Sequence, residues 1–355
     1  MRDKTNKIWA LLQKQGIVQG EQPEYEDLGS PWYVKALLAF SGWLAAIFIL
    51  GFIGTGFEFI LKNSGVAGVV GVMMIAGAFA LLRLPANEFV EHLGLATSMA
   101  GQILIIYAIF DLANHYQIVA WLLLTMLEVA LVALMPNFVH GAVSAMAAAI
   151  ALAMALTEMH IPYVIGGIVM FGTSFCWLNE FRYPQQMKKI RAVGYGLALA
   201  LIVLKGTTLF GYRAFGSLFS HQYELWAKPW LGELMIGAAA LYVVWSLLLR
   251  YGQPVKGRLS ITTLSATILI CALSMNVQGL TVGMVIICLA YFCANRVLLG
   301  LGIVSLLFYI SSYYYLLDTT LMEKSQSLLV VGLILLFVRW LMLRVFPAQS
   351  EVLHA

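Results

Sequence analysis

The side chain best placed to do chemistry in this sequence is Glu128, a carboxyl group in the middle of an apolar run. It lies within AWLLLTMLEVALVALM, a stretch that we expect to form a membrane-spanning helix. A lone carboxylate at that depth costs a few kcal/mol unless it is protonated, paired or facing water. Ser98 and Gln102 on the preceding apolar segment run past the same depth and are its expected neighbours. Two interpretations stay open: a proton or cation site, and a protonated glutamate hydrogen-bonded between helices.

A second group of polar candidates collects at segment ends that we expect to face the outside of the cell. These residues are Asp111, His115, Glu158, His160, Asp318 and Glu323. Carboxylates and imidazoles bind cations, so an outer vestibule for a cation or metal is one interpretation. Their spacing matches no metal-site signature, and solvated helix ends are the other interpretation. We predict a polar cluster at the outer face, with neither a bound metal nor a cofactor.

Familiar catalytic motifs are missing from the sequence. The chain has no HExxH, no GxSxG, no P-loop and no dinucleotide-binding glycine pattern. The four cysteines lie inside apolar runs and form no CxxC pair, which favours buried reduced thiols. An intramembrane enzyme would need side chains brought together only in space, so the sequence favours a protein that is not an enzyme.

The composition indicates that lipid surrounds most of the chain. Hydrophobic residues make up 61% of the 355 residues, charged residues make up 11%, and the mean hydropathy is +0.88. Soluble domains carry about 25% charged residues, so water is not the main solvent here. The net charge of +4 is too small to indicate a nucleic-acid surface. We predict an all-α, polytopic transmembrane helical bundle embedded in a lipid bilayer.

The chain divides into three parts. Residues 1–30 indicate a cytoplasmic amphipathic helix and an acidic linker, 31–346 the transmembrane helical domain, and 347–355 a cytoplasmic tail. Within the domain we distinguish twelve apolar segments, and roughly 20 apolar residues are needed to cross a bilayer. Their approximate ranges are 32–60, 65–82, 89–110, 117–135, 138–156, 161–180, 191–210, 231–250, 260–275, 279–295, 298–317 and 325–345.

The run from 260 to 295 is nearly continuous and too long for one span. Asn276, Gln278 and Gly279 at its midpoint indicate a tight hairpin between two short helices. Without that turn the chain would hold eleven spans in place of twelve.

The distribution of lysine and arginine gives an independent check of this parsing. With the N-terminus in the cytoplasm, only Lys62, Lys205, Arg213, Lys228 and Lys324 of the 21 basic residues fall on outer segments. An excess of basic residues on the cytoplasmic side is the general rule for membrane proteins. An odd number of spans would invert the C-terminal half, so the asymmetry favours twelve spans with both termini in the cytoplasm.

Small residues indicate which segments lie inside the bundle. Glycines recur along the second segment (65–82) and the sixth (161–180), and the fifth (138–156) is nearly polyalanine. The hydrophobic effect does not drive helices together in lipid, so close backbone contact through small residues takes its place. We therefore expect these three segments in the interior.

Two stretches near the chain ends are distinctive. SPWYVKALLAFSGWLAAIFILGFIG begins at Ser30, and YYYLLDTTLMEKSQSLLVVGLILLFVRWLM begins at Tyr313. They resemble the DUF4401 family of bacterial membrane proteins, and the resemblance covers nearly the whole chain. It implies a multi-pass bacterial inner-membrane protein of uncharacterised function, often associated with a second polytopic family, DUF2157. It implies no catalytic residues, and the positions that match its pattern are Trp32, Tyr33, Tyr314, Asp318, Glu323 and Lys324.

Three functions are compatible with these features. The first is a transporter-like protein for a small solute or ion, with Glu128 as the intramembrane titratable group. The second is a structural or assembly partner of another membrane protein, and the third, least favoured, is an intramembrane enzyme. A water-accessible cavity reaching Glu128 would favour transport, whereas a Glu128 sealed among helices with a hydrogen-bond partner would remove that support.

Overall fold

The computed structural model describes residues 62–83, 88–114, 116–215, 229–254, 256–275, 279–316 and 320–345, with residue 9, residues 11–16 and scattered positions between 34 and 55. All regular elements within these ranges are helices, which confirms the predicted all-α class. The predictions for the linker, most of the first span and the C-terminal tail fall outside the described residues.

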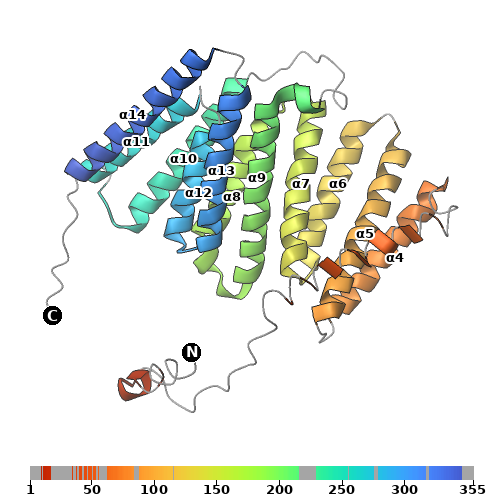
Figure 1. The fold of residues 1–355 in the computed structure, drawn as a ribbon. Coiled ribbons are helices and arrows are strands. Elements are labelled where there is room, and N and C mark those ends of the chain that lie inside the picture. The colour runs from red at the N-terminus through yellow and green to blue at the C-terminus, as the bar shows by residue number, and fades with distance from the viewer. Residues whose placement is uncertain are drawn as a thin grey trace.

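Each apolar segment predicted from residue 65 onward contains a helix. The helices are α4 (Ser64–Arg83), α5 (Glu88–Ala113), α6 (Gln117–Leu134), α7 (Phe138–Glu158), α8 (Val164–Leu178), α9 (Met187–Phe215), α10 (Pro229–Arg250), α11 (Arg258–Ser274), α12 (Leu280–Phe292), α13 (Arg296–Leu316) and α14 (Leu321–Val345). Two 3-10 turns, Glu180–Arg182 and Pro184–Gln186, connect α8 to α9. The helices stand side by side, with α4 and α5 at one edge and α11 and α14 at the other (Figure 1).

Among the residues that the structure describes, six helical stretches are long and apolar enough to cross a membrane. They are Ser64–Arg83, Phe89–Ala113, Gln117–Leu134, Phe138–Glu158, Pro184–Thr207 and Trp230–Arg250. The apolar helix α12 has 13 residues, and at about 1.5 Å per residue it is about 20 Å long, shorter than the hydrocarbon core. Length and composition of these helices together mark the chain as a membrane protein.

Polar residues at the turns determine where several helices begin. The Asn137 side chain accepts a hydrogen bond of 2.9 Å from the backbone N–H of His140 and caps the start of α7. At the start of α14, Thr320 and Glu323 cap one another: each backbone N–H bonds to the other side chain, at 3.2 and 3.3 Å. Such a reciprocal pair satisfies two amide donors that the first turn would leave unbonded. Glu323 therefore acts as a capping residue at the start of α14.

The run from 260 to 295 forms two helices, α11 and α12, as the central polar residues predict. Gly279 precedes α12 with φ of 92°, a left-handed conformation that side chains other than glycine rarely adopt. The Tyr309 ring also packs against it, so that an added Cβ would lie 2.5 Å from ring carbon Cγ. Both the turn and the close ring contact therefore require glycine at this position.

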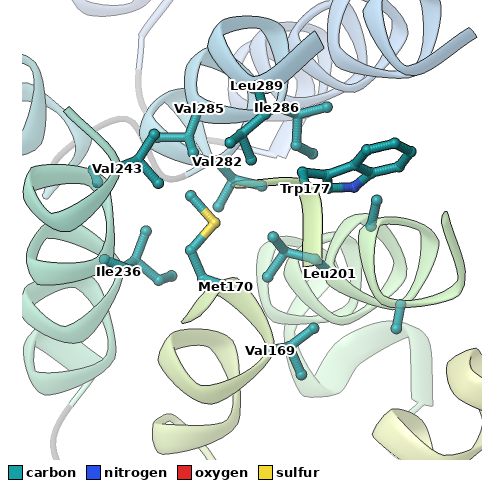
Figure 2. Close-up of a cluster of buried hydrophobic side chains, with 14 of the residues drawn as sticks. Val169, Met170, Trp177, Leu201, Ile236, Val243, Val282, Val285, Ile286 and Leu289 are labelled. Carbon is teal, nitrogen blue, oxygen red and sulfur yellow. The ribbon is translucent and has the colours of Figure 1, made fainter. Parts of the chain in front are cut away.

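A single cluster of buried apolar side chains holds the middle of the bundle together. Figure 2 shows Met170 and Trp177 of α8, Leu201 of α9 and Ile236 of α10 in one cluster with Val282 and Ile286 of α12. Alanines of α7, α9 and α10 complete the cluster and allow the helix axes to approach. The short helices α8 and α12 contribute many of its members, so their place is interior.

The expected burial of small-residue segments is confirmed for α7 and α8 and is wrong for α4. In α7, half of the apolar window is buried, whereas in α4 only 17% is. The glycines of α4 serve a two-helix contact: a Cβ on Gly71 would lie 2.7 Å from the Gly101 carbonyl oxygen of α5. Close packing of two backbones needs only one face of each helix. The other face of α4 remains apolar and exposed, at Val69, Val72 and Met73.

We predict that Gly71→Ala destabilises the protein by about 1–3 kcal/mol, because the added methyl group must separate α4 from α5. The matched control on the same helix is Gly77→Ala, where nothing lies within 4 Å of the added Cβ. Thermal unfolding of the purified protein in detergent measures both. An equal melting temperature for the two variants would contradict the close backbone contact.

Candidate functional site

A group of buried polar side chains lies on α5, α6 and α7. His140 of α7 lies at its centre, with its Nε2 atom 2.7 Å from Ser98 Oγ and 3.1 Å from Gln102 Nε2. On the other side of the ring, Ser144 Oγ lies 3.3 Å from His140 Nδ1. These contacts therefore join α5 to α7. Glu128 of α6 is buried as well.

The antiparallel pairing of α6 and α7 brings these side chains to one level. Glu128 lies six residues before Leu134, where α6 ends, and Ser144 lies six residues after Phe138, where α7 begins. Both side chains are therefore equally far from the turn between the helices. All five side chains are buried, with Glu128 and His140 each 1% exposed. We name this group, Ser98, Gln102, Glu128, His140 and Ser144, the α5–α7 polar cluster.

Glu128 is enclosed by helices. The carboxyl oxygen Oε2 is buried and has no hydrogen-bond partner among the described residues. Two cavities lie elsewhere, one beside the α6–α7 turn and one between α8, α9 and α10, and Glu128 lines neither. Burial of Glu128 among the helices withdraws support for a water-filled path to this carboxyl group.

Sequence reasoning found Glu128, Ser98 and Gln102 but missed Ser144 and His140, the residue that Ser98 and Gln102 contact. His140 lies in the first turn of α7. In a sequence, a histidine at that position looks like an ordinary solvated residue at a helix end. Counting residues outward from the Pro136 turn supplies the missing signal. Glu128 and Ser144 then fall at matching depths of an antiparallel pair, and His140 lies one helical turn from Ser144.

A second polar feature is an ion pair between α9 and α10. Lys205 Nζ donates to Glu233 Oε1, and both residues are buried. The pair lines a cavity of about 200 Å³ whose wall also includes Tyr163, Gly166 and Gly232. Charged side chains within a membrane region are costly and are by default candidates for a functional site.

Glycines allow the helices around this pair to approach closely. An added Cβ on Gly232 would lie 2.6 Å from the Tyr163 carbonyl oxygen, and one on Gly167 would lie 2.4 Å from Met235 Cβ. The first turns of α8 and α10 therefore touch backbone to backbone. This contact leaves the Lys205–Glu233 cavity bounded by the starts of two helices and by the α9 side chains Leu201 and Leu204.

Ionic contacts also fasten the opposite ends of these helices. Arg191 of α9 pairs with the buried Glu180, and Arg250 of α10 donates to the Leu178 carbonyl oxygen at the end of α8. The thiol of Cys293 lies 3.3 Å from the Trp177 carbonyl oxygen. These contacts satisfy the unbonded carbonyl groups at the end of α8 and are structural.

The outer-face candidates that the structure describes lie at the ends of different helices. His160, with φ of 68°, has its Nδ1 atom 2.9 Å from the Glu158 carbonyl oxygen in the turn after α7. Asp111 is exposed near the end of α5, and Glu323 caps α14. Among the described residues, no three histidine, cysteine, aspartate or glutamate side chains gather closely enough to hold a metal ion.

Some of the family-pattern positions can be placed. Lys324 Nζ lies 5.7 Å from the centre of the Tyr314 ring, a cation–π contact between α14 and α13. Trp32, Tyr33, Asp318 and the outer-face candidate His115 fall outside the described residues. The distinctive sequence near the C-terminal end of the chain thus includes a helix cap and an interhelical contact.

We predict that Lys205→Met destabilises the protein by about 3–5 kcal/mol, because it leaves Glu233 buried without its partner. The double variant Lys205→Met/Glu233→Leu regains most of that loss, since no buried charge remains. Thermal unfolding in detergent measures both, with the exposed Lys256→Met as a control for removing a positive charge. A double variant no more stable than the single one would contradict the pairing.

Comparison with known families gives one match. The model of a family described as "Domain of unknown function (DUF4401)" matches residues 31–345. No curated protein and no solved structure matches the chain. The family match therefore covers the helical region that holds both polar features, and its description assigns no chemistry to them.

Proposed function

The chain belongs to the DUF4401 family, and we propose that it is a transporter-like protein that carries a small solute or ion across the bacterial inner membrane. The observation behind this proposal is the buried Lys205–Glu233 pair on the wall of a cavity of about 200 Å³.

The chemistry of the cavity suits a small polar solute. An engineered cavity of about 150 Å³ holds benzene, so the volume here admits a molecule of several non-hydrogen atoms. Lys205 and Glu233 offer one donor and one acceptor on an otherwise apolar wall, as ligand pockets commonly do. This site replaces Glu128 as the expected solute contact, because Glu128 lines neither described cavity.

The proposed arrangement in the membrane has twelve spans with both termini in the cytoplasm. The positive-inside distribution of lysine and arginine supports it, as does the division of 260–295 into two helices. In this orientation the start of α8, the end of α9 and the start of α10 lie on the outer side. The cavity then opens toward the outer half of the bilayer.

Assembly with another membrane protein, such as a DUF2157 protein, is the alternative function. The apolar outer face of α4 at Val69, Val72 and Met73 supplies a surface for it. Purification of the chain in native lipid tests this alternative. Stoichiometric recovery of one partner, lost when these three residues become serine, would favour assembly over transport.

We predict that a thiol at residue 204 reacts with a hydrophilic, membrane-impermeant thiol reagent added from outside. Leu204 lines the cavity, whereas its neighbour Val203 is 45% exposed on the lipid-facing side. Leu204→Cys and Val203→Cys, each with the four native cysteines replaced by serine or alanine, form a matched pair. Labelling of Leu204→Cys alone supports a water-accessible cavity; equal reactivity of the two would refute it.

We predict that a fluorescent protein fused to either terminus is fluorescent. Such a reporter folds only on the cytoplasmic side, where both termini lie in the twelve-span arrangement. An alkaline phosphatase inserted between residues 216 and 228 is active for the opposite reason, since that segment is on the outer side in the twelve-span arrangement. Reporter activities that place the two termini on opposite sides would contradict an even number of spans.

A further inference from the structure

We propose that the Lys205–Glu233 cavity binds a small zwitterion of the α-amino acid class, with the ligand carboxylate on Lys205 and the ligand ammonium group on Glu233. This inference rests on the proposed function, because it takes the cavity between α8, α9 and α10 as the solute site. It adds the chemical class of the solute and the role of each charged side chain.

The two charged side chains of the cavity balance one another. Lys205 Nζ donates to Glu233 Oε1, and both residues are buried and line the cavity wall. An anionic ligand on Lys205 would leave an excess negative charge in the site, and a cationic ligand on Glu233 would leave an excess positive charge. An uncompensated charge away from water is costly. A ligand that carries both charges keeps the whole site neutral.

The pair can bind a zwitterion while its own contact persists. An ammonium group donates several hydrogen bonds and a carboxylate accepts several, so each group can bond to its partner and to a ligand. Because Lys205 Nζ and Glu233 Oε1 are in contact, the two charges of the ligand must also lie close together. An α-amino acid meets this requirement, since its ammonium group and its carboxylate share one carbon atom.

The start of α8 favours one orientation of the ligand. Ile165 and Gly166, in the first turn of this helix, line the cavity. Tyr163, the residue before the helix, makes no side-chain cap hydrogen bond. Amide groups in a first turn have no partner within the helix and carry partial positive charge, so they attract a carboxylate. Lys205 and the start of α8 together therefore favour the carboxylate end of the ligand.

The remaining wall limits the size and polarity of the ligand. Leu201, Leu204 and Ile236 are apolar, so they suit a hydrogen atom or a short alkyl side chain on the ligand. L-Alanine has as many non-hydrogen atoms as benzene, which fits an engineered cavity of about 150 Å³. The cavity here has about 200 Å³. We therefore expect glycine, L-alanine or L-valine, and we expect no amino acid with a third charge.

Equilibrium binding to the full chain in lipid nanodiscs tests the proposal. Radiolabelled glycine, L-alanine and L-valine are measured separately. Each amino acid that binds is compared with its analogue lacking the ammonium group and its analogue lacking the carboxylate, which for L-alanine are propionate and ethylamine. We expect each analogue to bind about tenfold more weakly or worse, because only the zwitterion supplies a counter-charge to both side chains.

Two double variants locate the binding. Lys205→Met/Glu233→Leu leaves no charge unpaired in the cavity, so it should fold and lose at least about tenfold in affinity. Arg191→Met/Glu180→Leu removes an ion pair outside the cavity and should leave the affinity unchanged. Binding that survives in Lys205→Met/Glu233→Leu overturns the proposal. If either variant fails to fold, the analogues decide on the unmodified chain. No binding of the three amino acids, or equal binding of a singly charged analogue, overturns it equally.

Uptake separates this proposal from transport itself. Sealed vesicles of phosphatidylethanolamine and phosphatidylglycerol that contain the purified chain are given the amino acid that binds. Binding without uptake supports the zwitterion site and counts against the transporter-like function. If none of the three amino acids binds while Leu204→Cys still reacts with the outer thiol reagent, the zwitterion site is refuted and the water-accessible cavity stands.

Discussion

Hydrocarbon offers no hydrogen bonds, and this constraint governs the whole structure. A polar group placed among acyl chains must find its partner within the protein or bear a cost of several kcal/mol. The backbone meets the requirement by forming helices, so the described chain is helical wherever it is regular. Side chains meet it by pairing across helices. His140 has contacts from α5 and from its own helix, and Lys205 is paired with Glu233.

The same constraint explains how the helices are held together. Apolar side chains gain little by leaving lipid for protein, so contacts depend on close backbone approach and on polar bonds. Gly71 faces Gly101 between α4 and α5, and Gly232 faces the Tyr163 carbonyl group between α10 and α8. Polar bonds add to these contacts. The α5–α7 polar cluster ties the peripheral α4–α5 pair to the interior helix α7, and the Glu180–Arg191 pair and Arg250 fasten the end of α8.

Sequence alone predicted the class, the helix ranges from residue 65 onward and the hairpin at Gly279, because each depends on local composition. It also named Glu128, Ser98 and Gln102, all three of which are buried. Contacts that join distant segments escaped prediction. Lys205 and Glu233 lie near opposite ends of a loop in the sequence, where each looks like a solvated residue, and only the packing of α9 on α8 and α10 buries both. The interior place expected of α4 was wrong for a related reason: its glycine pattern specifies a close neighbour but not how many neighbours there are.

The central claim is that two buried polar groupings, the α5–α7 polar cluster and the Lys205–Glu233 pair, lie within the lipid-covered region and join helices through contacts between polar side chains. A single-particle reconstruction of the protein in lipid nanodiscs measures this most directly. We predict side-chain density joining Lys205 to Glu233, and His140 to both Ser98 and Ser144, at depths surrounded by the acyl-chain belt. Density that turns these side chains outward to headgroups or to bulk water would contradict the claim.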